Sequence, residues 1–214
     1  MKARYKKYKL QFKRPASTSR GTYETRTVWY LFLEENGKTG TGECAPLPGL
    51  SNETPDEVEK LLNEISANPS SFIENAEAVK NVSSVRFALE MAWQDLKNGG
   101  RQIPIPSDFS KGKKGILING LIWMGHTELL LQQIKEKLEA GFRCIKLKIG
   151  SLDFEKELEI LNSIREKYDP SQVTLRVDAN GAFHPDEAIE KLQKLAQYQV
   201  HSIEQPISAG QWKK

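Results

Sequence analysis

Cysteine is scarce in this 214-residue sequence, and long apolar runs are missing. Cys44 and Cys144 stand alone, without the spacing of a disulfide framework or a metal site, which is typical of a reducing compartment where both thiols serve as packing residues. The longest apolar runs are far too short to cross a bilayer. The N-terminus is basic, but no apolar segment follows it, so no signal peptide is evident. We therefore expect a cytoplasmic protein with no membrane partner.

Histidine is nearly as scarce, with three in the chain. His126 falls in a loop, His184 precedes a proline that opens a helix, and His201 opens a strand. The position of His184 is typical of a helix-capping residue. None of the three is expected to act as a catalytic base.

The composition that remains is that of a globular chain, with 38% apolar and 28% charged residues. Residues 1–14 hold seven Lys or Arg and no acid, whereas the rest carries 24 basic and 28 acidic residues. A basic segment of this kind could contact nucleic acid. Apolar and aromatic side chains alternate with the charges, which favours a solvated strand with one packed face. Because no later basic patch recurs, no nucleic-acid partner is expected.

Residues 1–100 predict a small α+β domain. Segments rich in β-branched and aromatic residues predict three antiparallel strands, and Asn36-Gly37 predicts a hairpin turn. Helical spacing of apolar residues predicts two helices. The predicted strands are 4–13, 22–34 and 39–44, and the predicted helices begin near 54 and span 84–97. Pro15–Gly21 is expected to be a mobile loop, and 101–114, rich in Pro, Gly and Lys, a linker.

Residues 115–214 alternate strand and helix, which predicts a parallel sheet. The repeat suits a (β/α)-barrel or a doubly wound sheet, and no Gly-x-Gly-x-x-Gly follows the first strand to indicate dinucleotide binding. The segment holds three complete βα units and a fourth strand, whereas a barrel needs eight units. We therefore expect the first half of a (β/α)8-type barrel, with the chain ending in mid-domain. The predicted strands are 116–122, 143–149, 173–178 and 201–204, and the predicted helices are 127–140, 153–168 and 185–198.

Two lysines in the second of these strands carry the first functional signal. Lys146 and Lys148 are two residues apart, so both side chains face the same side of the strand. Like charges disfavour each other's protonation, and one of the lysines could therefore act as a base near neutral pH. The alternative is an edge strand whose lysines prevent aggregation.

The next two strands end in acids, Asp178 and Glu204, and Asn180 follows the first of them. The carboxyl ends of parallel strands meet at one rim, where barrel active sites lie. Two carboxylates without sulfur or imidazole suit a hard cation such as Mg²⁺, which can stabilise the enediolate formed when a lysine removes a proton next to a carboxylate. The alternative is a salt-bridge cluster that only closes the barrel mouth.

Three motifs in this order and spacing, Lys146-Leu147-Lys148, Asp178-Ala179-Asn180-Gly181 and Glu204-Gln205-Pro206, resemble the enolase superfamily, above all its muconate-lactonising branch. The N-terminal part is similar too. Ser19-Arg20-Gly21 and the Gly40–Gly49 segment with its Glu-Cys-Ala-Pro-Leu-Pro-Gly sequence look like the two loops of the family's capping domain. That segment and Asn119-Gly120 are most similar to the o-succinylbenzoate synthase family of menaquinone biosynthesis.

The resemblance implies an α/β chain in which an α+β capping domain precedes a TIM-type barrel, truncated here. It implies an enzyme that dehydrates a small-molecule carboxylate, 2-succinyl-6-hydroxy-2,4-cyclohexadiene-1-carboxylate. Lys148 would remove the α-proton and return a proton to the departing hydroxyl, while Lys146 tunes Lys148. Asp178 and Glu204 would hold Mg²⁺, with Mn²⁺ as a substitute. The supporting and substrate-facing residues would be Asn180, Asn119, Gly21, Leu50 and Ser51.

The family pattern also needs a third carboxylate on the fifth barrel strand and a second lysine on the sixth, and neither position exists in these 214 residues. We therefore expect the chain to be inactive alone. Other readings remain open: a dipeptide epimerase or N-acylamino-acid racemase of the same superfamily, or a non-catalytic remnant that kept the rim. The sequence does not indicate an oligomeric state.

Overall fold

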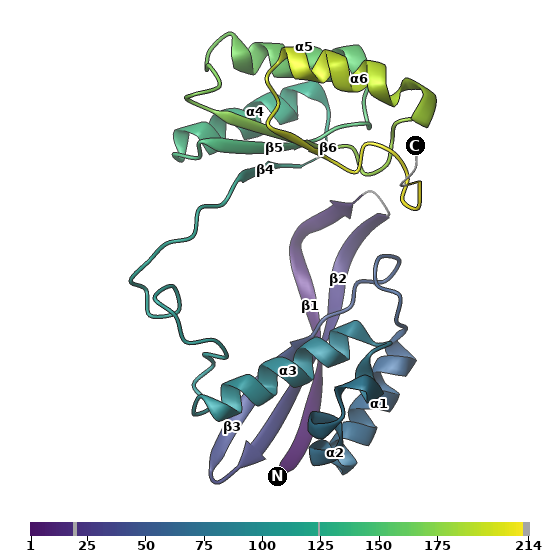
Figure 1. Cartoon of the computed structure of the whole chain (residues 1–214), viewed down its shortest axis with the longest axis vertical. Helices are drawn as coiled ribbons and strands as arrows, with labels where there is room; N and C mark the ends of the chain where they lie inside the picture. Colours follow the sequence, from purple (N-terminus) through teal and green to yellow (C-terminus); the bar gives the residue numbers. More distant parts are fainter. Residues whose placement is uncertain (19–20, 124, 212–214) are drawn as a thin grey trace. The chain divides into compact units, whose positions relative to one another are not determined.

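The computed structural model describes residues 1–18, 21–123 and 125–211, and the chain divides into two compact units, Met1–Ile116 and Leu117–Lys214. Each unit has its own hydrophobic core. In the described part of the chain, no helix is both long and apolar enough to span a membrane. Figure 1 shows both units and labels most of their helices and strands.

The first unit is built on an antiparallel sheet in the order β1-β2-β3, formed by β1 (Lys2–Thr18), β2 (Gly21–Glu35) and β3 (Lys38–Cys44). The prediction of a mobile loop from Pro15 to Gly21 was wrong, because the ladder continues to the pair Thr18↔Gly21. A register shift between Gln11 and Ala16 lets the edge strand pass Pro15, which lacks the N–H that a ladder needs. The predicted loop residues Ser19 and Arg20 lie outside the described residues.

Helices cover one face of this sheet (Figure 1). The predicted helix start is confirmed by a capping box, in which the Thr54 hydroxyl accepts from Glu57 N at 3.3 Å and the Glu57 carboxylate accepts from Thr54 N at 2.7 Å. Trp29, Leu31 and Leu33 alternate along β2 and are buried under the helices. The helical segments are α1 (Pro55–Ala67), α2 (Pro69–Glu74), η1 (Ala76–Val79) and α3 (Ser83–Lys97). The short α2 and η1 were not predicted, because helices of fewer than two turns show no periodicity.

β3 and α3 approach each other so closely that glycines on β3 lie directly against the backbone of α3. A Cβ added to Gly42 would lie 1.9 Å from the carbonyl oxygen of Ala88, so only glycine allows this contact. We expect Gly42→Ala to lower the free energy of unfolding by about 3 kcal/mol, because α3 must move off the sheet. Urea denaturation measures the loss. Gly115→Ala is the matched control, since nothing lies within 4 Å of its added Cβ, and equal stability of the two variants would contradict this packing.

The segment between the units runs without helix or strand from the end of α3 to Asn119. Its start is held by the buried Asp95, whose Oδ1 accepts from Ile103 N at 3.0 Å while Oδ2 accepts from Thr41 N at 3.0 Å. The predicted strand over 116–122 was too long: β4 covers only Gly120–Ile122, and Leu117 is fully exposed. The aliphatic run from Ile116, which includes two β-branched isoleucines, suits a strand, but within the described ranges no strand pairs with it.

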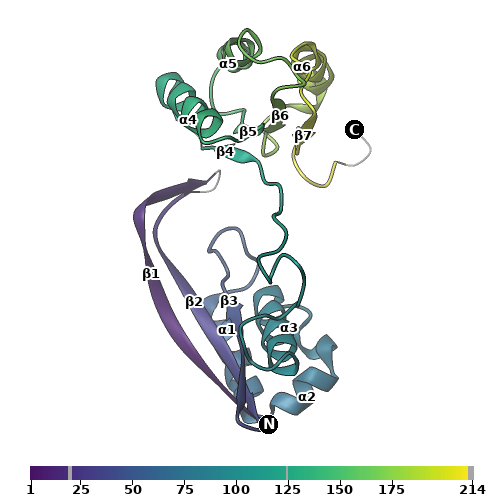
Figure 2. The ribbon, with the colours of Figure 1, turned by 90° about the vertical axis from the view of Figure 1, so that its left-hand side faces the viewer.

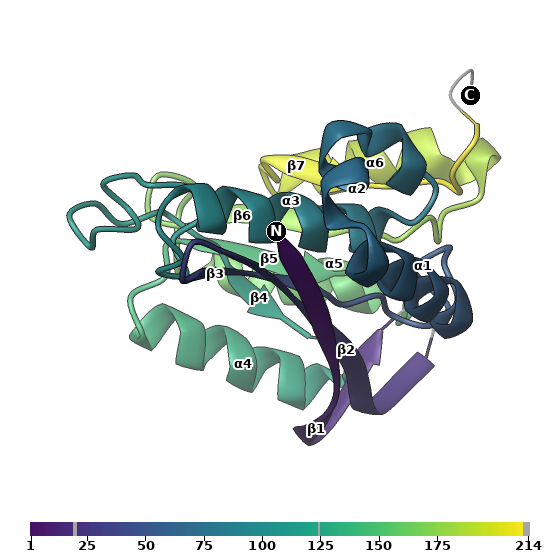
Figure 3. The same ribbon diagram turned by 90° about the horizontal axis from the view of Figure 1, so that it is seen from below.

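The second unit is a parallel sheet in the order β4-β5-β6-β7, whose strands lie side by side in Figure 3. Helices pack on one face of it (Figure 2), where they bury side chains such as Ile145 and Leu175. The predicted alternation of strands and helices is confirmed, and with it the α/β class. The elements are β4, β5 (Cys144–Lys148), β6 (Thr174–Asp178) and β7 (Ser202–Glu204), with α4 (Thr127–Glu139), α5 (Phe154–Arg165) and α6 (Pro185–Gln197) between them.

Candidate active site

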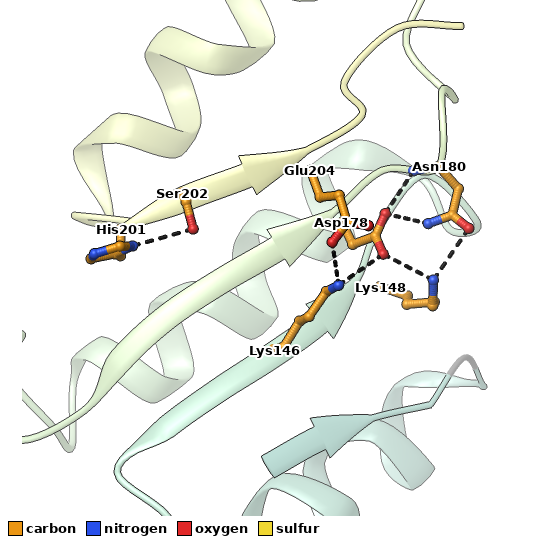
Figure 4. Close-up of polar contacts among 7 residues, drawn as sticks. All are labelled: Lys146, Lys148, Asp178, Asn180, His201, Ser202 and Glu204. Carbon is orange, nitrogen blue, oxygen red and sulfur yellow. Dashed lines mark hydrogen bonds and ion pairs between the residues drawn. The ribbon is translucent and has the colours of Figure 1, made fainter. Parts of the chain in front are cut away.

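The carboxyl ends of β5, β6 and β7 bring three predicted site residues level with one another. The register pairs Lys148 with Asp178, and Asp178 with Glu204. Because side chains alternate along a strand, these three and Lys146 face away from the helix-covered side that buries Ile145. Figure 4 shows their polar groups turned toward one another, with His201 and Ser202 at the other end of β7.

Lys146 lies between two carboxylates on neighbouring strands. Its Nζ is 3.2 Å from Oδ2 of Asp178 and also donates to Oε2 of Glu204. The Asp178 side chain is only 4% exposed, whereas that of Glu204 is 58% exposed. A single ammonium group therefore bridges a buried acid and an accessible one.

Lys148 shares the same acceptor. Its Nζ donates to Oδ2 of Asp178 at 3.0 Å and to Oδ1 of Asn180 at 3.2 Å. Asn180 has φ +49°, a turn conformation that asparagine tolerates better than most residues. Its backbone N donates to Oδ1 of Asp178 at 3.1 Å, and its side-chain amide donates to the same oxygen. Asp178 is thus the hub of the cluster.

The charges of the cluster set its protonation states. Burial by itself would raise the pKa of Asp178, but hydrogen bonds from Lys148 and Lys146 outweigh it and lower that pKa below the ordinary 3.8. The hydrogen bond to Glu204 is the main reason that the pKa of Lys146 lies above its ordinary 10.5. Lys146 is therefore held in the charged form. The prediction that repulsion between the two ammonium groups lets one lysine act as a base does not apply to Lys146.

The two acids can accommodate a divalent cation. A positive group, the Lys146 ammonium, already lies against both carboxylates, so their oxygens converge on one cation position. Mg²⁺ is commonly held by one or two carboxylates, with water and substrate completing its shell. Among residues 1–18, 21–123 and 125–211, no group of three or more His, Cys, Asp or Glu could hold a metal. This set of residues therefore fits Mg²⁺ as two ligands of a larger shell.

Comparison with known proteins places both units in one family. The family described as enolase C-terminal domain-like matches residues 129–213, and the one described as the MenC N-terminal domain matches residues 1–96. The sequence is 38% identical to o-succinylbenzoate synthase of Desulfotalea psychrophila, over 99% of this chain and 66% of that protein. The chain belongs to the enolase superfamily. The resemblance predicted from the sequence is confirmed.

Two further members of the superfamily bear on the site. The solved structure of o-succinylbenzoate synthase from Thermosynechococcus elongatus, complexed with Mg in its active site, is similar with a TM-score of 0.82 and 25% identity, over 100% of this chain and 63% of that one. A hydrophobic dipeptide epimerase of Roseobacter litoralis is 28% identical, over 98% of this chain and 63% of that protein. This chain thus spans less than two thirds of the length of both.

Of the other predicted site residues, one lies near the opposite end of the parallel sheet and three belong to the first unit. Asn119 directly precedes β4, and the register places it level with Cys144, at the amino end of the sheet. Gly21, Leu50 and Ser51 belong to the first unit. There the Ser51 hydroxyl accepts from Leu47 N at 2.9 Å and closes a turn on which Leu50 is exposed.

Sequence reasoning missed one residue that shapes this rim. The side-chain amide of Gln133, on α4, accepts from Trp123 N at 3.0 Å and donates to Trp123 O at 3.2 Å. It thereby fixes the backbone just beyond the carboxyl end of β4. A half-buried helical glutamine gives no signal of this role in the sequence. His126 and His184 are the N-caps of α4 and α6, which fits the capping role expected of His184.

Proposed function

We propose that this chain carries the base and two metal ligands of an o-succinylbenzoate synthase-type dehydratase. The observation that carries the proposal is the contact of both lysines with one buried oxygen, Oδ2 of Asp178, at 3.0 Å for Lys148 and 3.2 Å for Lys146. The 38% identity to o-succinylbenzoate synthase of D. psychrophila supports this activity over others of the superfamily. The substrate would be the succinyl-hydroxycyclohexadiene carboxylate of menaquinone biosynthesis.

The two lysines would have different tasks. Lys148, as a neutral amine, takes the proton on the carbon next to the substrate carboxylate, so that a C–H bond breaks. The electron pair forms a ring double bond as the hydroxyl leaves the adjacent carbon, and Lys148 returns the proton to that hydroxyl, which departs as water. Lys146, which Glu204 and Asp178 hold charged, attracts the substrate carboxylate. Asp178 and Glu204 would hold Mg²⁺ or Mn²⁺, which would supply a Lewis acid for the negative charge that develops on the substrate.

The remaining predicted residues would support the site rather than perform its chemistry. Asn180 would orient Lys148 through the bond from Nζ to its Oδ1. Gly21 and the turn at Leu50 and Ser51 would belong to loops that close over bound substrate, as the resemblance implies. Asn119 would support the first strand.

The test compares the 214-residue chain with a fused protein, in which these residues are followed by the part of the D. psychrophila relative that they do not span. We expect Mg²⁺-dependent dehydration by the fused protein and none by the chain alone, because two carboxylates leave the metal shell incomplete. Loss of the ring hydroxyl is followed by absorbance, with chelation by EDTA as the control. Full turnover by the chain alone would contradict the expectation that it is inactive. A fused protein that folds but does not dehydrate the substrate would contradict the proposed dehydratase function.

A dipeptide epimerase is the second candidate, favoured by the 28% identity to the epimerase of R. litoralis. It would use the same lysine to remove an α-proton, but it would return the proton to carbon. Assaying the fused protein on both a hydrophobic dipeptide and the cyclohexadiene substrate separates the two. A non-catalytic salt-bridge cluster predicts neither activity.

A further inference from the structure

The turn that follows Lys148 is held by a buried acid to which no task has been assigned. Glu157, on α5, is 4% exposed, and its Oε1 accepts from the backbone N of Gly150, Ser151 and Leu152 at 2.7, 3.1 and 3.1 Å. Three successive N–H groups that converge on one oxygen form the kind of backbone nest that binds anions. Here the anion is part of the chain itself.

Burying this acid is costly. Its other oxygen, Oε2, is buried without a hydrogen-bond partner in the part of the chain that the structure describes. Burial raises the pKa of Glu157 despite its three backbone donors and the nearby Lys191. A surface helix seldom retains a buried acid unless the acid stabilises something that an apolar side chain cannot. What Glu157 stabilises is the backbone two to four residues beyond Lys148.

The held turn packs directly on the turn after β6. A Cβ added to Gly150 would lie 2.3 Å from Cβ of Ala182, and Ile149 N donates to Asp178 O at 2.9 Å. Phe154, which follows the turn after β5, packs edge to face on Phe183, which follows the turn after β6, with ring centroids 5.7 Å apart. A displacement of residues 150–152 would therefore move the backbone that carries both Lys148 and Asp178.

We propose that Glu157 is a positioning residue, which fixes Lys148 relative to Asp178 and Asn180 by filling the nest formed by residues 150–152. It touches neither substrate nor metal and acts through the backbone. The effect on turnover rests on the proposed function, whereas the effect on the backbone does not.

The first test is amide hydrogen exchange in the 214-residue chain. Glu157→Ala should accelerate exchange at Gly150, Ser151 and Leu152 about tenfold, because each amide loses its acceptor. Formate should restore the protection by occupying the nest. Glu159→Ala, an exposed acid on the same helix, is the matched control. Unchanged exchange in Glu157→Ala, or equal acceleration in both variants, would overturn the proposal.

The second test is turnover by the fused protein. Glu157→Ala should lower kcat about 30-fold with KM little changed, because misplacement of a base affects chemistry more than binding. Glu157→Gln, which keeps the acceptor oxygen, should stay within about threefold. If Glu157→Ala does not fold, Glu157→Gln decides between the outcomes. Protected amides at residues 150–152 and a nearly normal kcat support the proposal, whereas faster exchange together with a large loss of kcat overturns it. Absence of turnover in the unmodified fused protein would refute the proposed dehydratase function. The hydrogen-exchange result would still decide whether Glu157 holds the backbone of residues 150–152.

Discussion

Replacing Lys148 by arginine should lower the kcat of the fused protein at least about 1,000-fold, because arginine keeps the charge but cannot lose its proton. Lys148→Ala should be equally inactive. The contacts that place Lys148 for this task are those from Nζ to Asp178 and Asn180, at 3.0 and 3.2 Å. Steady-state kinetics measures the loss, and a deuterium label on the α-carbon should no longer exchange with solvent.

The neighbouring lysine provides the contrast. Lys146→Arg should keep at least a tenth of the activity, because Lys146 is held charged by Glu204 and Asp178 and is needed for its charge. Lys156→Ala, an exposed lysine on α5, should have no effect. The assignment of the base would be wrong if Lys148→Arg stayed active while Lys146→Arg did not.

Replacing Asp178 by asparagine should raise the Mg²⁺ concentration for half-maximal turnover and lower kcat at least about 100-fold, since a Lewis acid contributes several kcal/mol. The change also removes the buried charge that both lysines contact. Asp186→Asn is the control, because Asp186 is an exposed acid at the start of α6. An unchanged Mg²⁺ dependence in Asp178→Asn would exclude Asp178 as a ligand.

The same substitution has a signature in acid. Because the folded state lowers the pKa of Asp178 below 3.8, its carboxylate stabilises the fold above that ordinary value, and the contribution is lost as pH falls through the lowered one. Stability of the unsubstituted chain should therefore fall more steeply with acid than that of Asp178→Asn. Urea denaturation between pH 6 and about 2.5 measures this.

The site cluster could be predicted from sequence because its signals are local. Side chains alternate along a strand, which places Lys146 and Lys148 on one face. Parallel strands bring their carboxyl ends to the same edge of the sheet, whatever the length of the helices between them. The residues that hold the cluster could not be predicted in this way. Glu157 and Gln133 form hydrogen bonds with backbone groups, which no pattern of side chains in the sequence indicates. A glutamate or glutamine on a helix is more often solvated, so neither residue stands out.

The strand boundaries show the same limit. Ile116–Ile118 have the composition of a strand but pair with no strand among the described residues, whereas Ala16–Thr18 have the composition of a loop but pair with β2. The composition of a segment shows which conformations it tolerates, and pairing with another strand decides which of them it adopts. Both errors arise where the deciding contact is made by another part of the chain.

The carboxylates of the rim already have positively charged partners before any ion arrives. Two ammonium groups, Lys146 and Lys148, face two carboxylates, Asp178 and Glu204. An acidic pocket made only of metal ligands would repel itself until it was loaded, and its folding would depend on metal supply. Under the proposed function, the base and its neighbour would serve as temporary counter-ions. Metal starvation would then leave a folded but inactive enzyme that regains activity when metal returns, without new synthesis.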